Sequence, residues 1–245
     1  MKTLEVLVNP FGKLESESPD NITTPNFGKD ELLERVWNYF HSFDGKTIYY
    51  GEDPHYYSPL MRHVSPLNLD FILTPAQISV FFEQLKNLPR QMLHKNVYAG
   101  LFVSRLINNS YQNENNHFVI DTGDKFTSNL VVGLNGEKDN PLEITINGFG
   151  GDYLGQESKN SIIRVKGSVD NQCGGFCDNL NVTVEGNAGG FFGYNSKNSF
   201  FEIFGDVGDV FGSDAEKSTF IVHNRKAYDT FKKNIRNRSK VILRD

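Results

Sequence analysis

A repeat of 19 residues in the second half of this chain constrains its fold more than any other feature. Glycine returns at this interval in two series between residues 125 and 224. The first series is Gly148, Gly167, Gly186 and Gly205, and the second is Gly136, Gly155, Gly174, Gly193 and Gly212. A unit of this length is too short to bury an apolar face alone, so its copies must stack to share one core. The repeat therefore predicts a solenoid.

Two apolar columns recur with the same period and mark one strand in each coil. They are Ile144, Ile163, Val182, Phe201 and Phe220, and, two places on, Ile146, Val165, Val184, Ile203 and Val222. A spacing of two places puts both columns on the same, inward face of a strand. The columns between and after them are polar, except at Phe204 and Ile221. These two exceptions predict that another part of the chain covers the last coils.

The corners of the coils are expected where the conformationally permissive residues fall. Glycine in the two series supplies positive φ or room for close approach of the backbone. A third corner carries Asn160, Asn179 and Asn198, again 19 residues apart. Asparagine tolerates the left-handed conformation and can hydrogen-bond its neighbour in a stack.

Segments such as residues 184–193 (VEGNAGGFFG) and 203–212 (IFGDVGDVFG) resemble the repeat of the GXGXG β-helix family. That repeat occurs in the C-terminal domain of the glutamate synthase large subunit and in one of the subunits of formylmethanofuran dehydrogenase. The resemblance covers residues 125–224. It implies a right-handed parallel β-helix that carries no catalytic group and serves as a packing scaffold in a larger enzyme.

The remaining sequence predicts an N-terminal α+β region over residues 1–120, before a β-helix over 121–224. Its expected strands are residues 3–8 and 47–50, and its expected helices are 30–43, 74–87 and 90–107. The start of the second helix is the clearest, because Thr74-Pro-Ala-Gln77 combines an N-cap, a proline at the first position and a capping-box partner. Residues 118–120 are expected to begin a first, degenerate coil.

Open ends of stacked strands template aggregation, so we expect lids at both ends of the solenoid. Residues 71–107 are predicted to pack near the first coils. A basic helix within residues 225–245, running from about Ala227 to Asn237, is predicted to cap the last coils at Phe204 and Ile221.

The charge distribution limits the kinds of partner that the protein is expected to bind. Residues 225–245 hold eight lysines and arginines against two aspartates, a net charge of +6, and the rest of the chain carries −11. An acidic body does not favour nucleic acid. The start of the chain lacks the apolar core of a signal peptide, and no apolar run approaches a membrane span. The sequence therefore predicts a cytoplasmic protein that binds neither nucleic acid nor membrane.

Several groups of residues that could carry chemistry fit a structural role better. Cys173 and Cys177 occupy inward columns, which predicts buried fillers, and no partner completes a zinc site, so we expect neither metal nor cofactor. The glycine runs lack the strand-to-helix context of phosphate loops. Asp152 and Asp209 share a column but stand three coils apart, about 14 Å, which is too far for a glycosidase pair.

A Pro- and Tyr-rich loop over residues 49–63 is the remaining candidate for a ligand site. Its polar and aromatic members are Glu52, Asp53, His55, Tyr56, Tyr57 and His63. Carboxylates and imidazoles bind metals and relay protons, and tyrosines stack on ligands. The leading hypothesis is a non-catalytic scaffold or protein-interaction module with a protein partner or a second copy. The alternative is a protein or enzyme that binds a carbohydrate or small ligand through this loop.

Overall fold

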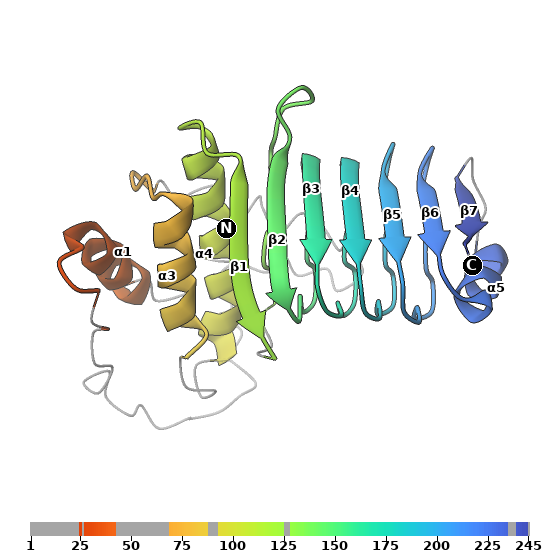
Figure 1. Cartoon of the computed structure of the whole chain (residues 1–245), viewed down its shortest axis with the longest axis horizontal. Helices are drawn as coiled ribbons and strands as arrows, with labels where there is room; N and C mark the ends of the chain where they lie inside the picture. The colour runs from red at the N-terminus through yellow and green to blue at the C-terminus, as the bar shows by residue number, and fades with distance from the viewer. Residues whose placement is uncertain are drawn as a thin grey trace, which may run out of the picture.

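The computed structural model describes residues 25, 27–42, 69–87, 93–124, 128–234 and 239–244. Helices precede a row of strands, and a short helix and a last strand follow it (Figure 1). The helices are α1 (Glu31–Ser42), α3 (Pro75–Leu85), α4 (Leu93–Tyr111) and α5 (Arg225–Asn234). The strands are β1 (His117–Gly123), β2 (Leu142–Gly148), β3 (Lys159–Val165), β4 (Asp178–Val184), β5 (Phe200–Ile203), β6 (Thr219–Val222) and β7 (Lys240–Leu243). In this part of the chain, no helix has the length and apolar character needed to cross a membrane.

The strands form one parallel, 7-stranded sheet in chain order, so the chain winds forward one coil at a time. The register pairs Ile163 with Ile144 on one side and with Val182 on the other, and all three side chains are buried. Phe118 on β1 extends the same ladder, because it pairs with Ile144. The parallel β-solenoid and its 19-residue coils are therefore confirmed, and β1 belongs to the first, less regular coil.

The interior changes from aliphatic to aromatic along the stack. In the last coils, Phe201 and Phe220 stack with ring centroids 4.8 Å apart and planes 13° apart. Phe192 and Phe211, from the opposite wall, meet these two rings edge-on at 5.3 Å and 5.2 Å. Offset and edge-on contacts are the arrangements that aromatic rings prefer, so the C-terminal coils hold a continuous aromatic core.

The predicted corners are confirmed, and they depend on residues in the left-handed conformation. Asn160, Asn179 and Asn198 have φ of 46°, 53° and 49°. Gly174 has φ of +66°, and a Cβ there would lie 2.6 Å from the Phe201 ring. Only glycine meets both demands without strain, since the conformation and the packing each oppose a side chain.

In the other glycine series, close packing of the backbone between coils explains the choice of glycine. Gly167 does not have positive φ, but a Cβ on it would meet the backbone of Gly148 in the preceding coil. Backbone bonds link these corners from coil to coil, as where Gly186 donates to the Gly167 carbonyl oxygen at 2.8 Å. This series therefore keeps successive coils close enough to hydrogen-bond.

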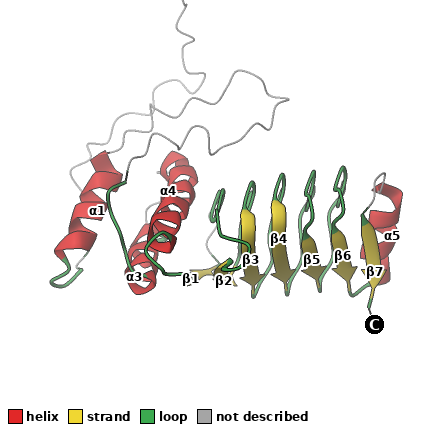
Figure 2. Ribbon diagram, turned by 90° about the horizontal axis from the view of Figure 1, so that it is seen from above, coloured by secondary structure: helices red, strands yellow, loops and turns green. Residues whose placement is uncertain are grey.

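α3 and α4 lie beside the first coils, as predicted for residues 71–107, and α1 packs on the outer side of α3 (Figures 1 and 2). The capping box that begins α3 is present, with Thr74 and Gln77 bonded reciprocally. The rings of Trp37 on α1 and Phe81 on α3 meet edge-on at 5.8 Å, and Phe81 also contacts Phe102 on α4. The helix expected to end at residue 107 continues to Tyr111. The strands expected at residues 3–8 and 47–50 lie outside the described residues.

The C-terminal end contains a helix, as predicted, but the helix covers different residues. Phe231 on α5 packs onto the open end of the core, with ring centroids 5.2 Å from Phe211 and 4.6 Å from Phe220. Phe204 is 46% exposed, so the prediction that the helix covers it is wrong. Its ring instead stacks on His223, with the centroids 4.1 Å apart.

Ile221 is buried, but a strand rather than a helix lies beside it. It pairs with Ile242 on β7, a strand that the columns of the repeat do not predict. Glu202, its partner on the other side, binds the Arg244 guanidinium at 3.2 Å, so this contact spans the strand that carries Ile221. β7 thus continues the sheet by one strand, and α5 lies behind it at the same end of the stack (Figure 2).

Candidate functional site

The loop that the sequence nominated as a ligand site, residues 49–63, lies outside the described residues. The structure therefore does not place Glu52, Asp53, His55, Tyr56, Tyr57 or His63. Their role remains a prediction. In the part of the chain that the structure describes, no three His, Cys, Asp or Glu side chains gather where they could hold a metal ion.

The two cysteines are buried in the core as free thiols, as their columns predicted. Burial raises the pKa of the Cys177 thiol to about 12, and a sulfur–oxygen contact of 3.4 Å to Ser199 opposes this only in part. Burial, and then the neighbouring Cys177, raise the pKa of the Cys173 thiol as well. Because the thiolate is the reactive form, neither sulfur is poised for nucleophilic or redox chemistry.

The aspartates on the turns are joined by an asparagine. Asn171 donates its side-chain amide to a carboxylate oxygen of Asp170 at 2.9 Å and to one of Asp152 at 3.2 Å. Partial burial, and then the charge of Asp152, raise the pKa of Asp170. The columns of the repeat relate Asp152 to Asp209 and not to Asp170, which falls in a different column. Asp152 also accepts the Asn171 backbone N–H at 3.0 Å. The two aspartates and Asn171 therefore link one coil to the next.

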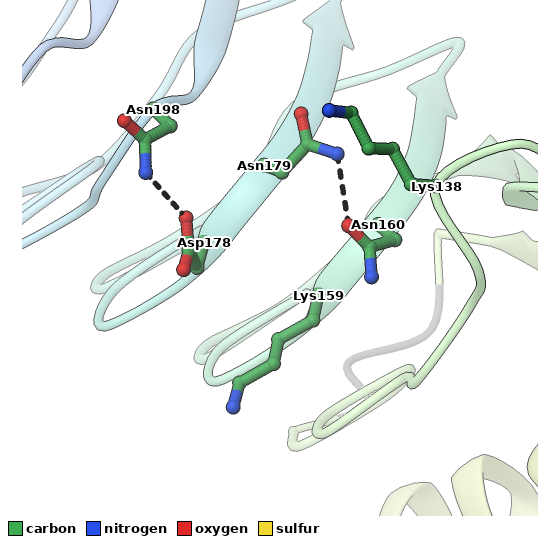
Figure 3. Close-up of a pocket in the computed structure, with 6 residues that line it drawn as sticks. All are labelled: Lys138, Lys159, Asn160, Asp178, Asn179 and Asn198. Carbon is green, nitrogen blue, oxygen red and sulfur yellow. Dashed lines mark hydrogen bonds between the residues drawn. The ribbon is translucent and has the colours of Figure 1, made fainter.

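A groove lined by polar and charged side chains runs along the asparagine corner (Figure 3). Its volume is about 270 Å³, and six residues line it: Lys138, Lys159, Asn160, Asp178, Asn179 and Asn198. The corner puts the three asparagines in a row because each occupies the same left-handed position of its coil. The sequence identified this row, but not the charged residues beside it.

Hydrogen bonds order only part of the row. Asn179 donates its amide to the Asn160 side-chain oxygen at 2.9 Å, and Asn160 donates to the Gly136 carbonyl oxygen at 3.0 Å. The ladder then breaks, because Asn198 donates to the Asp178 carboxylate at 2.8 Å instead of to Asn179. Within the row, only the Asn160 side-chain oxygen accepts a hydrogen bond, and those of Asn179 and Asn198 do not.

The chemistry that this groove offers is recognition by hydrogen bonds and charge. The Lys138 side chain reaches toward Asn179, whereas Lys159 points away from the row (Figure 3). Asn198 donates its side-chain amide to one oxygen of the Asp178 carboxylate at 2.8 Å, which orients this carboxylate beside the row. An exposed groove of this kind can hold a small polar or anionic group, and it contains no nucleophile paired with a base.

Comparison of the chain with models of protein families, with curated proteins and with solved structures found no match.

Proposed function

We propose that this protein is a non-catalytic scaffold or protein-interaction module that works as part of a larger assembly. The observation that carries the proposal is the use made of its repeating polar side chains. Asn171, Asn187 and Asn179 bond to residues 19 positions away, in neighbouring coils. These groups, which would otherwise be available for chemistry, hold one coil on the next.

Coils bonded to one another in this way form regular outer faces, which supports a role in binding protein partners. Each coil bonds to its neighbours through backbone groups at the strand and at the corners. Solenoids built from such nearest-neighbour contacts offer long, ordered faces on which a partner docks. The segments 184–193 and 203–212 support the further proposal that the chain is a member of the GXGXG family, whose repeat serves as a packing scaffold.

The test of this function is affinity purification of the tagged full chain from its native cell, with quantification of what accompanies it. We expect one protein partner at a constant molar ratio that persists through a wash at raised ionic strength. A second tagged protein of similar size and charge, purified in parallel, controls for non-specific carry-over. A chain that comes out alone and monomeric contradicts the proposal.

The polar groove favours a second candidate function, the binding of a small polar ligand. A thermal-shift screen of sugars, nucleotides and inorganic anions tests it, since a ligand at 100 times its Kd adds roughly 2.7 kcal/mol to the free energy of unfolding. The Lys138→Ala variant is the matched control for binding in the groove, and His55→Ala is the control for the loop over residues 49–63. A shift that survives both substitutions, or no shift with any ligand, contradicts this candidate.

A further inference from the structure

The two edges of the sheet differ in whether other parts of the chain bond to their backbone groups. At the β1 edge, Ser79 on α3 donates its hydroxyl to the Val119 carbonyl oxygen at 2.6 Å, and Lys86 donates to that of Asp121 at 3.2 Å. Side chains of α3 and of the residue that follows it therefore occupy this edge. At the other edge, no strand among the described residues pairs with β7 on the side away from β6.

The backbone of β7 leaves hydrogen-bonding groups at that edge. Lys240 and Arg244 donate their N–H groups to Ser218 and Val222 on the β6 side, each at 3.0 Å. Bonding alternates along a parallel strand, so Val241 and Leu243 direct their N–H and C=O groups away from β6. α5 contacts β7 from behind, and both views place it beside this strand at the end of the stack (Figures 1 and 2). The free edge is a template for one more strand.

The side chains of β7 define what that strand should carry. Lys240, Ile242 and Arg244 lie on the outer face and are exposed, whereas Val241 and Leu243 are half-buried against the core. An added strand would therefore place apolar residues inward beside Val241 and Leu243. Its outward residues would stand beside Lys240 and beside Arg244, whose guanidinium also contacts Glu202, and opposite charge is favourable there.

A second copy of this chain does not fit the edge. Antiparallel pairing of two β7 strands about a two-fold axis at Ile242 puts Lys240 opposite Arg244, and like charges directly opposite each other are destabilising. Head-to-tail stacking requires a free β1 edge, which the Ser79 and Lys86 side chains occupy. The positive charge of the C-terminal residues, which includes the exposed Lys233 on α5, also favours an acidic occupant.

We propose that the free edge of β7 is a docking site for an extended, acidic segment of a partner protein, which adds to the sheet as a further strand. This inference rests on the proposed scaffold function and assigns the surface through which it acts. Main-chain bonds to Val241 and Leu243 supply affinity, and alternating apolar and acidic side chains supply specificity.

The test uses the full chain and a fluorescent peptide of about nine residues that alternates valine and glutamate, a length suited to one strand. Fluorescence anisotropy compares it with the corresponding valine–lysine peptide. We expect the acidic peptide to bind at least about tenfold more tightly, because two cations of β7 flank it. Equal affinity for both peptides, or no binding of the acidic one, overturns the proposal.

Two variants locate the binding at the edge. Leu243→Pro removes an N–H that faces away from β6 and leaves the β6 bonds intact, so we expect the acidic peptide to bind about tenfold more weakly. Lys240→Glu reverses an exposed charge without touching the core, and we expect a loss of about five- to tenfold. Lys166→Glu makes the same charge change at an exposed site on an inner coil, and we expect no loss there.

Separate outcomes overturn the edge proposal and the scaffold proposal. If Leu243→Pro and Lys240→Glu retain a natural partner in the same ratio as the wild type, the edge proposal fails and the scaffold function stands. If the wild type dimerises with rising concentration and Leu243→Pro does not, a second copy fills the edge and the proposal is overturned. If the acidic peptide binds all variants equally, the binding lies elsewhere and the proposal is overturned.

Discussion

The N-terminal and C-terminal ends of the solenoid are closed by different kinds of contact. At the N-terminal end, α4 is bonded to the first coil, as where the Ser104 hydroxyl accepts the Val132 N–H at 3.0 Å and Asn108 donates to the Gly133 carbonyl oxygen at 3.0 Å. At the C-terminal end, the buried side chains of Ala227 and Phe231 on α5 pack on the core, and the strand β7 pairs with β6.

The difference shows two ways to end a repeat. Backbone-directed bonds spread the N-terminal closure over many residues and fix the helix in one position. The C-terminal closure also has backbone-directed bonds, such as that of Ser239 to the Ala215 carbonyl oxygen, but Phe231 supplies the largest fully buried side chain of α5. The ion pairs at that end are partly or fully exposed, such as Lys226 with Asp206 at 2.9 Å, and such pairs add little stability.

Loss of the Phe231 ring should have the largest effect on stability. Its side chain is fully buried against Phe211 and Phe220, so Phe231→Ala should lower the free energy of unfolding by about 3–5 kcal/mol. Urea unfolding measures this. Phe191→Ala is the control, because that ring is 37% exposed, and it should cost less than about 1 kcal/mol. Equal costs would show that the C-terminal closure is not concentrated on one ring.

Gly100→Ala should have the next largest effect and tests how tightly α4 is fixed on the first coil. Alanine favours a helix over glycine by about 1 kcal/mol. A Cβ on Gly100, however, would meet the Ser128 carbonyl oxygen and would lie 2.7 Å from the Asn129 carbonyl carbon. Backbone cannot move aside as a side chain can, so the clash should win, with a net loss of about 2 kcal/mol.

The control for this substitution is Gly190→Ala, where the nearest atoms to a Cβ lie 3.3 Å and 3.4 Å away. We expect a cost below about 1 kcal/mol there. A Gly100→Ala chain that is as stable as the wild type would mean that α4 can shift on the coil, which would remove the difference between the two ends.

A matched pair of serines compares the hydrogen bonds at the two ends. Ser104 is fully buried, and Ser104→Ala leaves the Val132 N–H without a partner, at a cost of about 1–2 kcal/mol. Ser239 bridges the Ser218 N–H and the Ala215 carbonyl oxygen but is half-buried, so water can replace it in Ser239→Ala at a cost of about 0.5 kcal/mol. Differential scanning calorimetry of both variants measures the ratio. A larger loss for Ser239→Ala would reverse the comparison.

The sequence predicts the middle of the molecule better than its ends. Each column of the repeat is observed several times, so one irregular residue does not hide it, and the left-handed corner at Asn160, Asn179 and Asn198 follows from the residue type. The capping box at Thr74 is equally local. Features that depend on a single period or on a local motif were therefore predictable.

β7 was missed because the period fails there. Lys240 pairs with Thr219, 21 residues earlier, since α5 replaces the usual corner. The column of Phe204 is otherwise polar, which predicts a helix interface there, but a neighbouring ring on the same face, His223, is enough to accommodate Phe204. Contacts between a coil of the repeat and an element outside the repeat leave no signal in the aligned columns of the sequence.

The candidate groove was only half predictable for the same reason. The asparagines recur with the period, whereas Lys138 comes from the irregular first coil. No spacing relates Lys138 to Asn179, and only the folded corner brings them to one hollow. The nominated loop over residues 49–63 has no repeat to fix it, so its prediction rested on residue types alone.

The smallest effect we expect is a loss of stability in acid, and it compares the contribution of charged side chains at the two ends. Asp30 precedes α1 and accepts the Gln77 side-chain amide at 2.7 Å and the Leu33 N–H at 3.1 Å. These bonds, that of Gln77 first, hold the pKa of Asp30 below its ordinary value of 3.8. Because the folded-state pKa is the lower one, the stabilisation is complete above that ordinary value and is lost as pH falls through the folded-state pKa.

Asp30→Asn should therefore melt slightly below the wild type at neutral pH, and the gap should close in acid, where the wild-type carboxyl is protonated. Melting temperatures of both chains between neutral pH and about pH 3 measure the gap, which should be smaller than that of Ser104→Ala because the carboxylate is solvent-accessible. Asp229→Asn, which removes an exposed pair with Arg225 on α5, is the C-terminal control. A gap that stays constant with pH would assign the effect of Asp30→Asn to helix capping rather than to charge.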